Sequence, residues 1–154
     1  MQVKTTRFGI LNVEEEKMLV FPSGMVGFPH LHDYFFVPAQ GNDVFAWMQA
    51  QNDPDVAFLM VDPFVFFPDY DVKLNKGICD FLQIRDQSEV TILTTVTIPP
   101  REGVRGMTAN LLAPVVINHV RAVGRQVIMD GSGYKIKHTL FSHLLKDSER
   151  RACG

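Results

Sequence analysis

The 154-residue sequence is poor in cysteine, in tryptophan and in long apolar runs. Its two cysteines, Cys79 and Cys153, lie far apart in unlike contexts, so we expect no disulfide framework and a reducing compartment. No apolar run approaches the roughly 20 residues that a membrane-spanning helix needs. The first residues lack the apolar core of a signal peptide. These absences predict a protein that stays in the cytoplasm.

The net charge of −2 is too near neutral to indicate a protein that binds nucleic acid directly. Its distribution is uneven, however. Residues 1–77 carry 5 Lys and Arg against 10 Asp and Glu, whereas residues 78–154 carry 10 against 7. An acidic half can complement a basic protein partner and speed the encounter. A solvated surface with unevenly placed charges is the alternative interpretation.

Residue patterns that carry catalysis or bind metals are missing from the sequence. His30 and His32 share one face of a strand, but no cysteine or histidine pair adds the spacing of a zinc site. Asp69 and Asp71 form a carboxylate pair without a third catalytic element. Ser23 lacks the GxSxG turn of a hydrolase nucleophile. We therefore expect no enzyme and no metal site.

The segment PSGMVGFP, residues 22–29, contains two glycines and two prolines and is predicted to be a shaped loop. It lacks the Gly-Lys-Ser/Thr sequence of a phosphate-binding loop, so its glycines are expected to supply positive φ angles and close packing. We expect no cofactor. A small barrel that binds a flavin-type cofactor stays open as the alternative, because such barrels often carry no compact motif.

Short strand-like runs separated by turn signals predict an all-β, mainly antiparallel fold: a small closed or partly closed barrel-like domain with one or two short helices. The expected strands include residues 3–8 ended by Gly9, a hairpin of 34–38 with 44–51, the alternating run 89–98, and 115–117 returning at 126–129 after a turn near Gly124. Ile78, Phe81 and Leu82 lie at helical spacing within residues 75–84. Residues 1–154 are expected to form one domain, with 139–154 as a short helix and a frayed tail.

Residues 62–70, DPFVFFPDY, contain two prolines and four aromatic residues. Prolines so close together exclude a helix interior and a central strand, so we expect this segment along an edge or across the mouth of the fold. Aromatic side chains exposed there would form a partner-binding patch. The alternative is that the rings fold inward as a plug.

A distinctive pattern runs through FPSGMVGFP with Phe35, the pair DVAFLMVDPFVFFPDYDV and EVTILTTVTIP, and above all MTANLLAPVVINHVRAVGRQVIM, residues 107–129. Together these segments resemble the FliW family of flagellar assembly factors. The resemblance runs from about Phe8 to His138 in the order and spacing of the family. The residues after His138 match no family pattern.

The resemblance implies a small barrel-like protein without enzymatic activity that acts in the cytoplasm. FliW proteins bind flagellin and, alternately, the RNA-binding translational repressor CsrA. Antagonism of CsrA in the family is allosteric and non-competitive, so the protein need not mimic RNA. Release from flagellin lets FliW relieve the CsrA block on flagellin translation. We expect a free monomer that makes no contact with a membrane.

The residues expected to contact these partners are Phe64, Phe66, Phe67, Asp69, Tyr70, Asn110 and Asn118. The first five lie in the expected edge segment, and the asparagines are possible rim contacts. For each asparagine, a turn or capping role is the alternative interpretation. We expect Tyr70→Ala and Asp69→Lys to weaken partner binding and to leave thermal stability nearly unchanged.

Overall fold

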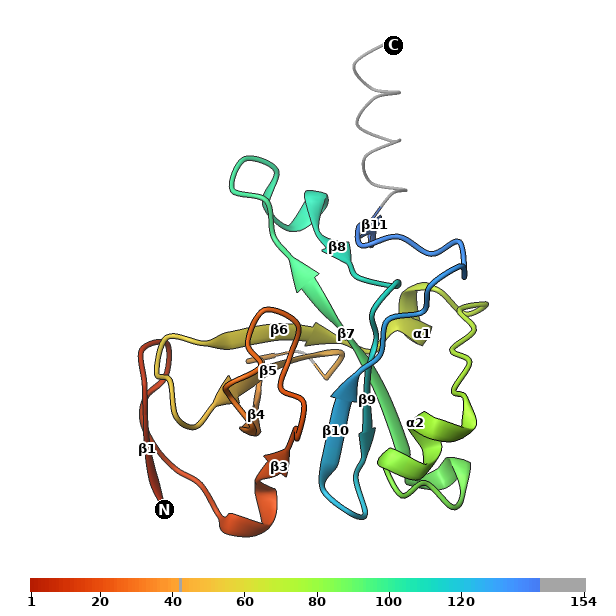
Figure 1. Ribbon diagram of the computed structural model, residues 1–154. Helices are drawn as coiled ribbons and strands as arrows, with labels where there is room; N and C mark the ends of the chain where they lie inside the picture. Colours follow the sequence, from red (N-terminus) through yellow and green to blue (C-terminus); the bar gives the residue numbers. More distant parts are fainter. Residues whose placement is uncertain (42, 142–154) are drawn as a thin grey trace.

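Seven strands hydrogen-bond in a ring and close a β-barrel (Figure 1). In ring order they are β3 (Leu19–Val20), β4 (Asp33–Pro38), β5 (Phe45–Ala50), β6 (Ala57–Val61), β7 (Val90–Thr97), β9 (Val115–Asn118) and β10 (Val123–Gln126). Neighbours in the ring are antiparallel except β10 and β3, which pair in parallel at Val123 and Val20. The ring confirms the predicted all-β, mainly antiparallel barrel.

The computed structural model describes residues 1–41 and 43–141. Outside the ring, β1 (Gln2–Thr5) and β2 (Gly9–Asn12) form a hairpin, and β8 (Thr108–Ala109) pairs with β11 (His138–Thr139). Helical segments are η1 (Glu15–Lys17), α1 (Pro63–Phe66), α2 (Lys76–Phe81), η2 (Gln87–Glu89) and η3 (Gly103–Gly106). The expected helix and frayed tail at the C-terminus fall largely on residues 142–154, outside the described residues.

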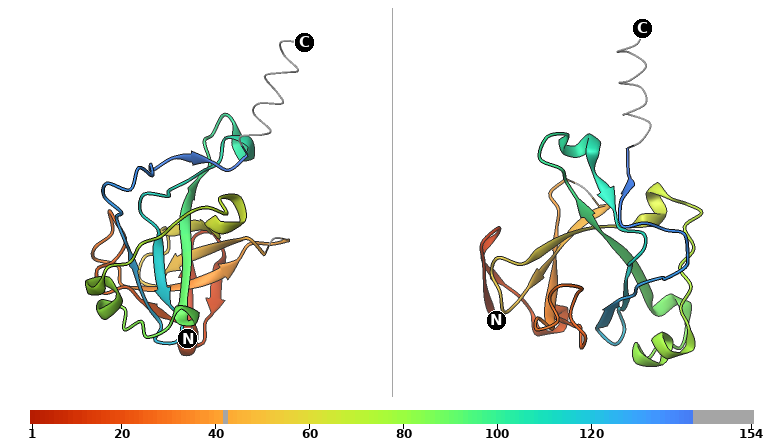
Figure 2. Two further views of the ribbon diagram at one scale, coloured as in Figure 1. Left: turned by 90° about the vertical axis from the view of Figure 1, so that its right-hand side faces the viewer. Right: turned by 45° about the horizontal axis from the view of Figure 1, so that its top comes forward.

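The described helices are short. None of those in residues 1–41 and 43–141 has both the length and the apolar character to cross a membrane. Figure 2 shows α1 and α2 outside the ring of strands, with the β1–β2 hairpin on the opposite side of the molecule.

Strand β7 pairs with three ring or flanking strands along its length. Its first four residues pair with β9, Thr94 and Thr95 pair with β6, and Val96 and Thr97 pair with β8. The predicted alternation in residues 89–98 sets the two side-chain faces of the strand: Leu93 packs on the barrel core, whereas Val90 and Ile92 pack on the cluster around α2. β7 therefore joins the barrel to the layer outside it.

The barrel interior is filled by aromatic side chains, methionines and branched aliphatic residues. Tyr34, Phe21, Met48 and Met60 are fully buried in this cluster. A second cluster lies outside the barrel, around α1, β8 and β11, and a third lies between α2 and the β9–β10 pair. Burial of these apolar surfaces is the main stabilising contribution to the fold.

Two local predictions are confirmed in detail. The hairpin of β4 and β5 is antiparallel, with Tyr34 opposite Ala50. Helix α2 starts after Asn75, whose Oδ1 accepts the Ile78 N–H at 2.9 Å and caps the helix. The fully buried Leu82 follows α2 directly, and Ile78 and Phe81 pack beside it, as their spacing predicts.

Two predicted roles for glycine are wrong. Gly124 does not turn the chain but lies inside β10, opposite Ile117. A Cβ there would lie 2.5 Å from Phe21 Cζ, so the glycine leaves room for that ring. The reversal comes earlier, where Ala122 has a positive φ of 56°. Gly9 likewise begins β2 instead of ending the first strand.

The expected edge segment, residues 62–70, is also different from the prediction. Its residues Pro63–Phe66 form the one-turn helix α1, with Pro63 in the first turn and Asp62 Oδ1 accepting the Phe64 N–H at 3.0 Å. Proline is tolerated in the first turn because its missing N–H would have no helical partner there. The proline pair therefore brackets a helix and does not mark a strand edge.

Candidate partner-binding groove

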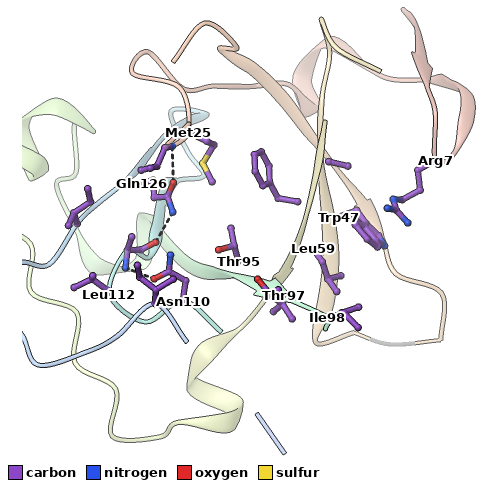
Figure 3. Close-up of a pocket in the computed structure, with 17 residues that line it drawn as sticks. Arg7, Met25, Trp47, Leu59, Thr95, Thr97, Ile98, Asn110, Leu112 and Gln126 are labelled. Carbon is purple, nitrogen blue, oxygen red and sulfur yellow. Dashed lines mark hydrogen bonds between the residues drawn. The ribbon is translucent and has the colours of Figure 1, made fainter. Parts of the chain in front are cut away.

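A groove of about 550 Å³ opens where β6 and β7 separate (Figure 3). The β6–β7 ladder consists of two pairs, Val61 with Thr94 and Met60 with Thr95. Beyond them, residues 57–59 of β6 and residues 96–98 after the pair on β7 line opposite sides of the groove. The groove therefore reaches from the outer surface toward the barrel interior, where Met25 and Phe58 also line it.

Large apolar side chains gather at this groove although they are accessible to solvent. Four that line it are strongly exposed: Val26 (59%), Ile98 (44%), Ile128 (52%) and Ile136 (61%). They come from the 22–29 loop, the end of β7, the end of β10 and the segment before β11. Contiguous exposed apolar surface of this kind marks sites of interaction with other proteins.

Gln126 holds one wall of the groove in place. Its Oε1 accepts the Val26 N–H at 3.0 Å, and its Nε2 donates to the Ala113 carbonyl at 3.1 Å (Figure 3). The loop that carries Val26 has positive φ at Gly24 (67°) and Gly27 (87°), which confirms the predicted role of these glycines. The loop is therefore tied to β10 by a side chain.

The far end of the groove carries its positive charge. The Arg7 guanidinium lies 4.1 Å from the centroid of the Trp47 ring (Figure 3). Phe8 meets the same ring edge-on at 6.0 Å. Trp47 on β5 lies opposite Leu59 on β6, the strand that lines the groove, so the Arg7–Trp47 pair lies next to that strand. Stacking on an aromatic face orients an arginine and leaves its N–H donors free for a ligand.

The predicted aromatic contacts on and after α1 divide between surface and core. Phe64 is 39% exposed and Asp69 is exposed, whereas Phe66 and Phe67 are half-buried against the cluster around β8 and β11. Tyr70 is buried, and its hydroxyl donates to the Leu111 carbonyl at 2.6 Å. Burial, and secondarily Tyr134, raises the pKa of Tyr70. Tyr70 is therefore not a surface contact in this structure, and its burial and hydrogen bond indicate that Tyr70→Ala would lower stability, contrary to the expectation from the sequence.

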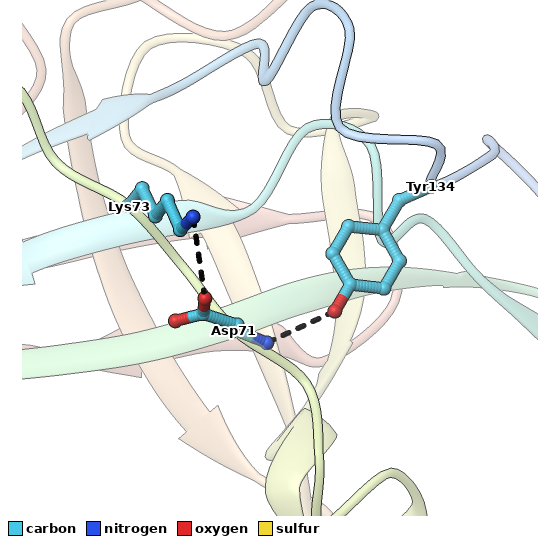
Figure 4. A network of polar contacts seen from close by, with 3 residues as sticks. All are labelled: Asp71, Lys73 and Tyr134. Carbon is cyan, nitrogen blue, oxygen red and sulfur yellow. Dashed lines mark hydrogen bonds and ion pairs between the residues drawn. The ribbon is translucent and has the colours of Figure 1, made fainter.

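Tyr134 packs on the same cluster and lies beside Asp71 and Lys73 (Figure 4). Its ring meets Tyr70 edge-on at 4.8 Å, and its hydroxyl accepts the Asp71 N–H at 3.0 Å. The Asp71 carboxylate lies 3.9 Å from Lys73 Nζ, and both side chains are largely exposed. Such an exposed pair contributes little to stability. The inward-folded interpretation of residues 62–70 fits Tyr70, while Phe64 stays at the surface.

The side chains of the two predicted asparagines form hydrogen bonds with nearby backbone groups. Asn118 is fully buried: its Nδ2 donates to the Leu82 carbonyl at 2.9 Å, and its Oδ1 accepts the N–H groups of Val120 and Arg121. Asn110 Oδ1 accepts the Ala113 N–H at 3.1 Å, and Asn110 also lines the groove. Asn118 is thus a turn residue, and only Asn110 has access to a partner.

A second, larger concavity of about 1010 Å³ lies beside the β4–β5 hairpin. Its floor includes Phe36 and Leu93 from the barrel interior. Acidic side chains at Glu14, Glu16 and Asp43 border it, with one lysine. We refer to this feature as the acidic concavity.

Within residues 1–41 and 43–141, no three of His, Cys, Asp and Glu lie close enough to hold a metal ion. His32 Nε2 instead bonds the Pro29 carbonyl at 2.8 Å within its own loop.

Sequence reasoning missed the groove, although it singled out Asn110. Isoleucines at 98, 128 and 136 occur in strand-like runs, where the same pattern fits buried and exposed faces. Pro99, two residues after β7 ends at Thr97, is the one local sign that this edge stays unpaired.

Comparison with known proteins gives a consistent result. Residues 2–140 match the family model described as FliW protein. The chain is 43% identical over 149 residues to a protein of Moorella thermoacetica named flagellar assembly factor FliW, covering 97% of this chain and 94% of that protein. A protein of the same name from Caldanaerobacter subterraneus is 37% identical over 145 residues, covering 94% and 95%. The structure also resembles a crystal structure of the flagellar assembly factor FliW, with a TM-score of 0.85, 30% identity, and coverage of 92% and 97%.

Proposed function

Because the chain belongs to the FliW family, we propose that it is a cytoplasmic flagellar assembly factor that binds flagellin and, alternately, CsrA. In this function flagellin occupies the protein while unassembled subunits are abundant. Once released, the protein binds CsrA and allosterically relieves repression of flagellin translation. It acts by binding other proteins and not as an enzyme.

The observation that best supports this function is the exposed apolar groove between β6 and β7. Surface of this kind costs solubility in a protein that binds nothing, and its four exposed aliphatic residues come from four separate segments. An apolar, shape-defined groove with few charges is typical of the centre of a protein–protein interface.

The acidic concavity supports a basic second partner. Residues 1–77 carry a net charge of −5, and three of their carboxylates border this concavity. An RNA-binding protein such as CsrA has to present positive charge to phosphate groups. Complementary charge would steer it toward this side of the chain and speed association.

The experiment that tests the function uses the full-length purified chain with purified flagellin and CsrA. Isothermal titration should give a saturable complex with each, and added flagellin should release CsrA from its complex. The free chain should sediment as a monomer. Absence of binding to both proteins would refute the proposal.

The flavin-type barrel remains the second candidate from the sequence, and the family comparisons do not favour it. The colour of the purified protein distinguishes the two candidate functions. A bound flavin would colour the protein yellow, with absorbance near about 450 nm. We expect a colourless preparation.

A further inference from the structure

The edges of β6 and β7 that face the groove lack strand partners in the part of the chain that the structure describes. The ladder between these strands stops at Met60 and Thr95, so Leu59 and Val96, and then Ala57 and Ile98, are not paired with each other. A strand edge without a partner is a template for pairing with another chain.

Hydrogen bonds on the far side of each strand show which backbone groups face the groove. The Thr95 carbonyl accepts the Asn110 N–H at 3.0 Å on the β8 side. Because backbone groups alternate along a strand, those of Val96 and Ile98 point the other way, into the groove. On β6, the Val56 carbonyl accepts the Ala50 N–H at 3.0 Å on the β5 side, so the groups of Ala57 face the groove.

The side chains around these edges define the chemistry of an occupant. The four exposed aliphatic residues give it an apolar environment. Among the described residues that line the groove, Arg7 alone is charged. It stacks on Trp47, and no acidic side chain in residues 1–41 and 43–141 forms an ion pair with it. A carboxylate on the partner would complete this end through charge-assisted hydrogen bonds.

We propose that the groove binds an extended, largely apolar segment of a protein partner by β-strand addition, with a carboxylate of that segment on Arg7. The backbone groups at Ile98 and Ala57 supply main-chain hydrogen bonds, and alternate side chains of the segment contact the aliphatic walls. The inference rests on the proposed function, because it assigns a binding mode to the same groove.

Two pairs of variants test the side chains. Ile98→Lys places a charge on the open edge, and Arg7→Glu repels a carboxylate. Their controls, Val120→Lys and Arg121→Glu, change exposed residues on the β9–β10 turn that do not line the groove. In titrations with purified flagellin and CsrA, both groove variants should weaken at least one complex by about tenfold or more. The controls should bind like the wild type.

Amide hydrogen exchange of the wild-type chain tests the backbone. The Ile98 N–H should exchange more slowly in the complex, whereas the Thr97 N–H, which faces β8, should be protected already in the free protein. Unchanged Ile98 exchange, or groove variants that bind as well as the wild type, would overturn the inference while leaving the proposed function intact. If the wild-type chain binds neither flagellin nor CsrA, both the inference and the proposed function are refuted. Protection of Ile98 through self-association would overturn the assigned occupant.

Discussion

At the residue scale, two buried tyrosines differ in what their hydroxyl groups contact. Tyr70 donates to the Leu111 carbonyl at 2.6 Å. Tyr34 lies in the barrel core, where its hydroxyl finds no partner among the described residues, and burial raises its pKa to about 12. A buried hydroxyl stabilises the fold only where it is hydrogen-bonded.

Removing the two hydroxyl groups should therefore have opposite consequences. Tyr70→Phe should lower the free energy of unfolding by about 1 kcal/mol, because the Leu111 carbonyl loses its donor. Tyr34→Phe should leave it unchanged or raise it. Urea denaturation of the two variants and the wild type measures both values. Equal losses in the two variants would contradict the assignment of hydrogen bonds.

His138 predicts how stability depends on pH. Its Nε2 accepts the Lys135 N–H at 2.8 Å, and its ring meets Phe67 and Tyr134 edge-on. Burial, followed by the Lys135 charge, lowers the pKa of His138. The folded state thus prefers the neutral ring, so stability should fall as the pH drops from about 6.5, the ordinary histidine value, through the folded pKa.

The measurement compares thermal midpoints above and below that pH for the wild type and His138→Asn. The wild type should lose more stability on acidification than the variant, because asparagine does not titrate. The other histidines are present in both proteins and cancel. Identical pH profiles would show that His138 does not contribute.

At the scale of elements, β10 can lie against the barrel core because Gly124 lacks a side chain. The Phe21 ring occupies the space that a Cβ would need, at 2.5 Å. The same strand closes the ring by its parallel contact with β3. Both the closure of the barrel by β10 and the packing of the Phe21 side chain therefore depend on Gly124.

Gly124→Ala should destabilise the protein by about 1–3 kcal/mol, because the added carbon forces the Phe21 ring or the strand to move. Gly77→Ala in α2 is the matched control. Its Cβ would meet only Asn75 Oδ1 at 3.4 Å, and alanine favours a helix, so this variant should be as stable as the wild type or more so. Denaturant midpoints decide the comparison.

A double variant tests the contact itself. Phe21→Leu combined with Gly124→Ala should be less destabilised than the sum of the single changes, because the smaller side chain leaves room for the new carbon. Additive losses would show that Gly124 is needed for another reason.

At the scale of the whole molecule, three acidic side chains and the positive Arg7 border different concavities. The acidic concavity lies beside the β4–β5 hairpin, whereas the groove between β6 and β7 carries the positive Arg7 and exposed aliphatic residues. Two surfaces of different chemistry suit a protein that is proposed to bind two different partners.

The acidic concavity should control association with CsrA. The double variant Glu14→Lys, Glu16→Lys should slow association, and raising the salt from about 0.1 M to about 1 M should slow it in the wild type, because the screening length falls from about 10 Å to about 3 Å. Asp80→Lys on α2, an exposed position away from this concavity, is the control. Charge steering would be refuted if neither the double variant nor the added salt changed the association rate measured by stopped flow.

Local sequence patterns by themselves determine much of this fold. Strands β4 and β5 pair where turn residues separate two β-forming runs, and helix α2 (Lys76–Phe81) forms within residues 75–84, where apolar positions recur at helical spacing. The family resemblance also follows from the sequence, and the comparisons confirm it. Each of these conclusions depends on residues close together in the chain.

Tertiary structure alone decided the rest. Only the contact of Val20 with Val123, about a hundred residues apart, closes the barrel, and only packing explains why Gly124 lies in a strand and Tyr70 in the core. The groove arises because β6 and β7 separate after two pairs, which no local pattern encodes. Periodicity tells which side chains share a face, but the element that covers that face, or leaves it open, comes from contacts between distant segments.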